Sequence, residues 1–394
     1  MRLPDERDAL ATLEAIASRP TVPYHEHRAL TAIAAELTRL GLPVTHDEYG
    51  QVATRITRGE PKRAVAFVAH TDHPGFEVIA ANGREGSARV LGGLRPRLFK
   101  EPVSVLIYDD EGGGPTRGTL TDFKLQVDAD QNALGGCRIS ADRELAVGQW
   151  AILDLPAFER SGDELRLRAA DDLAGCALVV SALALLRDDP RAFDVHAIFT
   201  RAEETGLFGA RIVAEDGALP LDTLVISVEA SNATFAPAGS GAVVRAGDLH
   251  NTFSNEAERY LRVAQERLRD ADPPVRTQRR LLAGGTCEAS AFVHLGWAAT
   301  GIALPNVNYH NAPETTDHFA PEIVRLSDLL SGIALLAEGA VAAGEDASEA
   351  WWPRARQVPS EIRDLLRRSH ARSQEWVVGQ SQLPRIKPPD EPDV

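Results

Sequence analysis

The sequence is poor in cysteine and has no long apolar run. Its three cysteines, Cys137, Cys176 and Cys287, lie far apart and form no CxxC pair. A disulfide scaffold is therefore excluded, and a reducing compartment is favoured. No stretch approaches the roughly 18 apolar residues of a membrane span, and the start, MRLPDERDAL, lacks the apolar segment of a secretory signal. We expect a cytoplasmic protein with no membrane partner.

Positive charge is also scarce. Asp and Glu number 57 against 42 Lys and Arg, which gives a formal charge of -15, and only four of the basic residues are Lys. The arginines are scattered and form no basic run. Because a surface with this balance repels phosphate backbones, we expect no nucleic-acid partner.

The order of segments predicts one α/β domain interrupted by a β domain. Residues 1–79 and 169–343 alternate apolar strands with helices, which is typical of an α/β layered domain. Residues 80–168 contain short alternating strands, including one at 164–168, separated by turn clusters, which is typical of a small β-barrel or sandwich. The predicted fold is a mixed central sheet with helices on both faces and an inserted small β-barrel domain. A helix near 322–342 should end it.

Residues 344–394 are expected to form a C-terminal extension. They contain the Trp351–Trp352 pair and end in PPDEPDV. The composition of the last ten residues is typical of disorder.

Four apolar strands each run directly into residues that can bind a metal, and a fifth candidate pair starts a helix. Since ligands of α/β sheets bind at the carboxyl ends of strands, we expect these residues to share one crevice. Each taken singly has a plainer interpretation, as a turn residue, a helix cap or a solvated carboxylate. The candidates are His70 with Asp72, Glu203 with Glu204, Glu229, His310, and Asp171 with Asp172.

The charge of this set calls for a counter-cation, because charged groups that follow core-type strands are costly without compensation. Two divalent cations would bring it close to neutrality. Imidazole and carboxylate ligands without thiolate fit catalytic zinc, with cobalt and manganese as alternatives. Asp171 is placed to bridge the two ions, and Asp72 is placed to orient His70.

Glu203 and Glu204 are neighbours with two different expected tasks. One can bind metal while the other stays free as a general base, and paired ions would bring the pKa of a bound water toward ~7. The expected reaction is therefore metal-assisted hydrolysis by a metal-bound hydroxide.

The motifs AHTDHPG, AADDLAG, RAEETGLFGA, SVEAS and NYHNAPE, in this order, resemble the dinuclear zinc aminopeptidases of the glutamyl, leucyl and deblocking type. The resemblance covers most of residues 5–342 and extends to AGGTCEASAF. It implies a metallo-aminopeptidase that removes N-terminal residues from peptides, and homo-oligomers such as tetrahedral dodecamers. It also implies a cis peptide between Asp171 and Asp172.

Carried over by position, the resemblance implies roles for six residues. Asp171 would bridge the metals and Glu203 would be the general base, while the remaining ligands divide into two pairs: His70 with Glu229, and Glu204 with His310. The family usually has Asp in place of Glu229, Arg in place of Leu173 and an acidic residue in place of His73. These departures bear on substrate preference more than on the metal core.

Two other functions fit the same residues. One is a metal-dependent amidohydrolase of the carboxypeptidase or deacylase type, which acts on N-acyl or C-terminal substrates. In that group the extra domain lies between the third carboxylate and the last histidine, whereas here the long gap lies between His70 and Asp171. The other is a binding protein that keeps the fold without activity.

Overall fold

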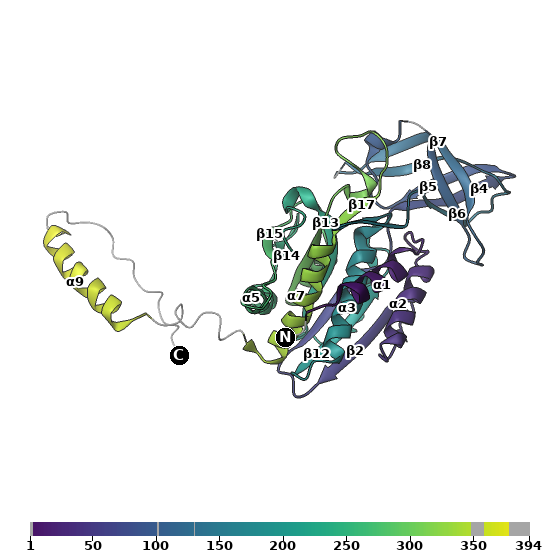
Figure 1. The fold of residues 1–394 in the computed structure, drawn as a ribbon. Coiled ribbons are helices and arrows are strands. Elements are labelled where there is room, and N and C mark those ends of the chain that lie inside the picture. The colour runs from purple at the N-terminus through teal and green to yellow at the C-terminus, as the bar shows by residue number, and fades with distance from the viewer. Residues whose placement is uncertain (1–2, 101, 130, 348–357, 378–394) are drawn as a thin grey trace, which may run out of the picture. The chain divides into compact units, whose positions relative to one another are not determined.

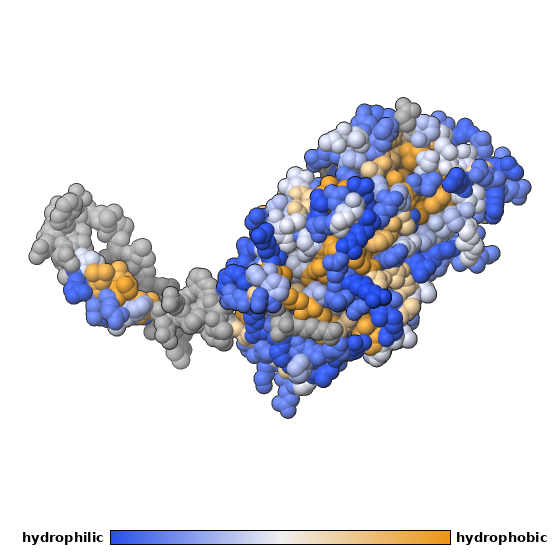
Figure 2. Space-filling view, viewed as in Figure 1, coloured by the Kyte–Doolittle hydropathy of each residue, from blue (hydrophilic) through white to orange (hydrophobic). Residues whose placement is uncertain are grey.

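The structure is a computed structural model, which describes residues 3–100, 102–129, 131–347 and 358–377. The chain divides into two units, Met1–Ser348 and Glu349–Val394. The second unit contains helix α9 (Ser360–Val377), on which Ile362, Leu365 and Leu366 are exposed; Figure 2 shows apolar surface on this helix. The predicted disorder of the last ten residues and the Trp351–Trp352 pair lie outside the described residues. The predicted domain limits stay predictions.

The first unit is built on a mixed sheet of eight strands (Figure 1). In spatial order these are β1 (Thr45–His46), β2 (Val52–Arg58), β12 (Phe193–Thr200), β3 (Ala64–His70), β13 (Leu224–Asn232), β16 (Ala299–Asn306), β14 (Val243–Gly247) and β15 (Gln278–Leu281). The central neighbours β12, β3, β13 and β16 are parallel, and β2 and β14 flank them in antiparallel pairing. The carboxyl ends of the four central strands therefore meet at one edge of the sheet.

Helices cover both faces of this sheet. They are α1 (Glu6–Ala17), α2 (His27–Arg39), α3 (Ala170–Arg187), α4 (Phe208–Glu215), α5 (Asn255–Arg269), α6 (Glu288–His294) and α7 (Leu326–Gly344). Ala66 and Val68 of β3 pack in a core cluster with Val213 of α4 and Phe292 of α6. The alternate residues of β3 point to the opposite face, and α3 and α7 contact that strand. The predicted α/β layering is confirmed.

Helix α7 is the one helix among the described residues that is long and apolar enough to cross a membrane. Of its apolar window, 89% is buried inside the fold. Burial of this extent is the pattern of a core helix, which is apolar all round because it has neighbours on every side.

The predicted β-barrel is confirmed. Its strands are β4 (Gly75–Asn82), β5 (Glu85–Leu91), β6 (Val103–Tyr108), β7 (Thr116–Val127), β8 (Ala133–Ala141) and β9 (Trp150–Leu153), and they close in the order β4-β5-β8-β7-β6-β9. Phe76, Val105, Leu120 and Ile139 point into one buried core inside it. The alternating burial of β6 is the pattern that the sequence indicated for this region.

Two details of the predicted fold are wrong. The strand at 164–168 was assigned to the barrel, but β11 (Glu164–Leu167) forms a separate sheet with β10 (Phe158–Ser161) and β17 (Glu322–Arg325). The helix expected from residue 322 starts at Leu326, because β17 precedes it. Buried Leu165 faces Val324 across this sheet. Local alternation predicted the strand but could not identify a partner so distant in the chain.

Candidate metal centre

The predicted site residues converge at the carboxyl edge of the parallel strands. His70 is the last residue of β3, Glu203 and Glu204 follow β12, and Glu229 lies in β13. His310 lies in η3 (Tyr309–Asn311), just after β16, and Asp171 lies in the non-helical first turn of α3. The structure thus brings together every residue that the sequence proposed as a metal ligand or base.

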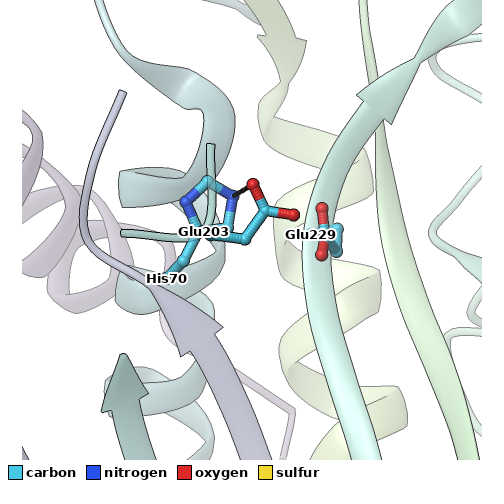
Figure 3. A group of neighbouring side chains, drawn as sticks. All are labelled: His70, Glu203 and Glu229. Carbon is cyan, nitrogen blue, oxygen red and sulfur yellow. Dashed lines mark ion pairs between the residues drawn. The ribbon is translucent and has the colours of Figure 1, made fainter. Parts of the chain in front are cut away.

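These residues form two groups, each with its potential donor atoms within 4.8 Å of one another. One group is His70, Glu203 and Glu229, whose side chains point toward one another in Figure 3. The other is Asp171, Glu204 and His310. Imidazole nitrogens and carboxylate oxygens without thiolate are a donor set that suits a divalent cation of catalytic type.

Asp171 lies between the two groups and faces both. Its Oδ1 is 3.3 Å from Nε2 of His70, and its Oδ2 is 3.4 Å from Nε2 of His310. The residue is 1% exposed. The peptide bond between Asp171 and Asp172 is cis, as the resemblance implied. Asp172 accepts the backbone N–H of Gly175 at 3.2 Å, so it caps the helix rather than joining the groups.

Asp72 contacts His70 and also holds the backbone of Glu203 and Glu204. Its Oδ1 is 3.5 Å from Nδ1 of His70, and that nitrogen is 3.2 Å from the Asp72 carbonyl oxygen. The two carboxylate oxygens also accept the backbone N–H groups of Glu203 and Glu204, each at 3.0 Å. One buried carboxylate therefore fixes the turn after β12 against the end of β3.

Glu322 supports the centre and was missed by sequence reasoning. It is fully buried at the start of β17, and its carboxylate accepts the backbone N–H of Asp171 at 3.0 Å and that of His310 at 2.7 Å. His310 has a left-handed backbone with φ of 55°, which needs such support in a non-glycine residue. The only signal in the sequence was an acidic residue two positions after Phe-Ala, at the start of an expected helix.

Glu288 is a second buried acid that the sequence did not reveal. It begins α6 directly after the Gly-Gly-Thr-Cys segment, and it accepts a hydrogen bond from the hydroxyl of Thr200, the residue of β12 that pairs with His70 of β3. Burial raises the pKa of Glu288 to about 8. Glu288 thus lies close to the group that contains His70.

The electrostatics of the centre fit a bound cation. Burial alone would lower the pKa of His70, yet the charge of Glu203 and the carboxylate of Asp171 raise it well above its usual value. The Glu203 pKa is raised well above normal, first by burial and then by Glu229 and Glu204. Oδ1 of Asp171, Oε1 of Glu204 and both ring nitrogens of His310 are buried without a hydrogen-bond partner. Buried oxygen and nitrogen atoms without a hydrogen-bond partner suit the ligands of a divalent ion.

An α/β sheet that presents imidazoles and carboxylates at its strand ends is typical of a metal-assisted hydrolase. Comparison with known proteins indicates which class of hydrolase this is. The model of the M42 glutamyl aminopeptidase family matches residues 136–322. The predicted resemblance and the predicted enzyme class, a hydrolase of peptide bonds, are thereby confirmed.

Individual relatives agree with that family. A protein of Acetivibrio thermocellus, provisionally named an aminopeptidase, is 24% identical over 353 residues, which cover 85% of this chain and 99% of the relative. The aminopeptidase of the archaeon Desulfurococcus kamchatkensis is 19% identical, with a TM-score of 0.73 and coverage of 88% and 98%. The Pyrococcus horikoshii TET1 peptidase is 20% identical, with a TM-score of 0.67 and coverage of 84% and 99%. These two structures share the fold of this chain.

Proposed function

We propose that the protein is a metal-dependent aminopeptidase that removes N-terminal residues from peptides with the help of two divalent cations. The observation that carries the proposal is the position of Asp171, whose two oxygens face His70 and His310 separately at 3.3 and 3.4 Å. A carboxylate in this position can serve two ions at once. Zinc is the expected metal, and cobalt or manganese would suit the same donors.

In this proposal the candidate ligands form two pairs, with Asp171 between them. His70 and Glu229 would hold one ion, Glu204 and His310 would hold the other, and Asp171 would serve both. When bound, the ions would polarise the scissile carbonyl and lower the pKa of the attacking water.

Glu203 is the residue that moves the proton. Its backbone is fixed by Asp72, and its Oε2 lies 4.0 Å from Nε2 of His70 at the edge of the first group. Burial raises the pKa of its carboxylate well above the usual value, which suits a general base that accepts a proton from water and passes it to the leaving amine.

The structure has room for a substrate beside these residues. A cavity of about 590 Å³ is lined by residues that include Asn232, Asn306 and Tyr309. A second, smaller cavity shares Asn232 and Tyr309 and reaches Glu229. A concave site next to perturbed titratable groups is where substrate binding is expected.

The proposal includes a homo-oligomer in the cytoplasm. The TET1 peptidase of Pyrococcus horikoshii, which shares this fold, can assemble into a tetrahedron or a large octahedral shell. Cys137, Cys176 and Cys287 are all buried and free, which is compatible with a reducing compartment. Light scattering after size-exclusion chromatography tests the assembly.

The substrate class is tested by a release assay. Amino-acid anilides and N-acetyl amino acids are offered separately, with and without a chelator. The proposal predicts release from the anilides alone, and none after chelation. Release from N-acetyl amino acids alone would favour the deacylase type of hydrolase, and release that survives complete removal of metal would contradict metal dependence.

A further inference from the structure

The turn that carries the proposed base has an unusual backbone. It runs from Arg201 to Glu204, and Ala202 within it adopts a left-handed conformation with φ of 54°. A non-glycine residue in this region is strained and persists only where its surroundings hold it. The backbone N–H groups of Ala202, Glu203 and Glu204 all donate to side-chain carboxylates from other parts of the chain.

Glu26 supplies the first of these carboxylates. It is fully buried at the start of α2, yet its side chain makes no capping bond to that helix. Its Oε1 instead accepts the N–H of Ala202 at 3.0 Å and that of Tyr24 at 2.8 Å, and its Oε2 accepts from Nε of Arg201 at 2.8 Å. The Glu26 carboxylate thus holds the backbone of the turn at Ala202, one residue before the proposed base.

Arg201 also holds this turn through hydrogen bonds. Besides its bond to Glu26, it donates to the carbonyl oxygen of Tyr49 at 2.6 Å and to that of Tyr24 at 2.8 Å. Tyr24 is itself left-handed, with φ of 74°. Burying the charged carboxylate of Glu26 near Asp72 would cost free energy without a neighbouring cation. The guanidinium of Arg201 is that cation, and its planar set of N–H groups can donate several hydrogen bonds in fixed directions, which a point charge cannot do.

We propose that Glu26 and Arg201 are positioning residues for the reaction: together with Asp72 they hold the 201–204 turn so that the Glu203 carboxylate stays at the edge of the His70 group. The inference rests on the proposed function, because it assigns Glu26 a role through Glu203. Asp72 fixes the N–H groups of Glu203 and Glu204, while Glu26 fixes Ala202, so the strained turn is held on both sides.

The test is Glu26→Gln in the full-length, metal-loaded enzyme. The amide cannot accept from Ala202, Tyr24 and Arg201 together, so kcat should fall about 10–100-fold, while KM and the number of metals per chain stay at the wild-type values. The matched control is Glu338→Gln. Glu338 is also a buried carboxylate, 2% exposed, that pairs with two arginines, Arg191 and Arg267, in a separate network. Its replacement should lower the melting temperature and leave kcat unchanged.

A double-mutant cycle separates positioning from general stability. If Glu26 acts through Glu203, then Glu26→Gln should cost nothing further in a Glu203→Gln background, because the positioned group is already gone. Arg201→Lys changes the residue that pairs with Glu26, and it replaces Glu26→Gln as the test if that variant does not fold. It should also lower kcat at unchanged KM.

Three results would overturn the inference: wild-type kcat in Glu26→Gln or Arg201→Lys, independent losses that multiply in the double mutant, or loss of metal from Glu26→Gln, which would mean that Glu26 supports a ligand rather than the base. Failure of the proposed function looks different. In that case Glu203→Gln alone would keep full turnover, whatever Glu26→Gln does.

Discussion

Oδ1 of Asp171 lies 3.3 Å from Nε2 of His70, although the two residues belong to different elements on either side of the inserted barrel strands. Burial alone would raise the pKa of Asp171, but the neighbouring imidazoles of His310 and His70 hold it well below its usual value. Asp171 is therefore a buried, charged carboxylate that faces both histidines. Its position explains why residues so far apart in the chain act as one centre.

Glu203 and Glu204 provide the first prediction, because adjacent residues have different proposed roles. Glu203→Gln should lower kcat by about 10²–10⁴-fold, the usual contribution of a general base, and should keep both metals. Glu204→Gln should lower metal content, because an amide replaces a charged ligand. Turnover of an amino-acid anilide and elemental analysis of the same samples check both. Full turnover in Glu203→Gln would remove it as the base.

Glu322 provides the second prediction. Its carboxylate accepts the backbone N–H groups of Asp171 and His310. In Glu322→Gln the amide NH₂ would replace one accepting oxygen and would face at least one N–H group that it cannot accept. Metal affinity or activity should fall by about 10–100-fold, as for other residues that support ligands. Competition with a fluorescent chelator measures the affinity.

Asp328→Asn is the matched control for Glu322→Gln. Asp328 is equally buried and accepts two backbone N–H groups, from Gly239 and Gly241 at 2.7 Å each. This variant should lose thermal stability but keep metal affinity. Equal loss of affinity in both variants would show that Glu322 has no special connection to the centre.

Glu288 provides a third prediction, on pH. Its pKa is raised from 4.5 to about 8, so between these values the folded protein keeps a proton that the unfolded chain releases. The stability that this group contributes is complete below pH 4.5 and is lost as the pH rises toward 8, with a slope of about 1.4 kcal/mol per pH unit for one proton.

Glu288→Gln should remove this slope, since the amide resembles the neutral acid. Urea unfolding of the chelator-treated protein at pH 5 and pH 8 measures the difference. Relative to the wild type, the variant should gain stability as the pH rises between these two values. An identical pH dependence in both proteins would contradict a raised pKa at Glu288.

Most of the candidate ligands could be predicted from the sequence because they lie in, or just after, an apolar strand, whereas Asp171 was recognised at the start of a helix. The run Ala64–Ala69 leads straight to His70, and the parallel sheet then determines where such residues meet. The barrel was also predictable, because the burial of its strands alternates locally. The presence of short strands in this region therefore followed from short-range patterns, whereas the start of α7 and the partners of β11 did not.

The supporting carboxylates could not be predicted in the same way. Glu26 and Glu322 hold backbone groups of residues more than a hundred positions away, and local patterns gave them the appearance of helix-start residues. Strand β17 was missed for the same reason, since its pairing with β11 is set by tertiary contacts. Hydrogen bonds to distant backbone leave no periodic trace in the sequence.

The number of metal ions per chain tests the central proposal most directly. Protein stripped with a chelator is titrated with zinc and, in parallel, with cobalt, and bound metal is counted by elemental analysis together with recovered turnover. Two ions per chain in the wild type, and loss of both tight binding and turnover in Asp171→Asn, are the expected results. Full activity with no bound metal, or two tightly bound ions in Asp171→Asn with normal turnover, would contradict the account.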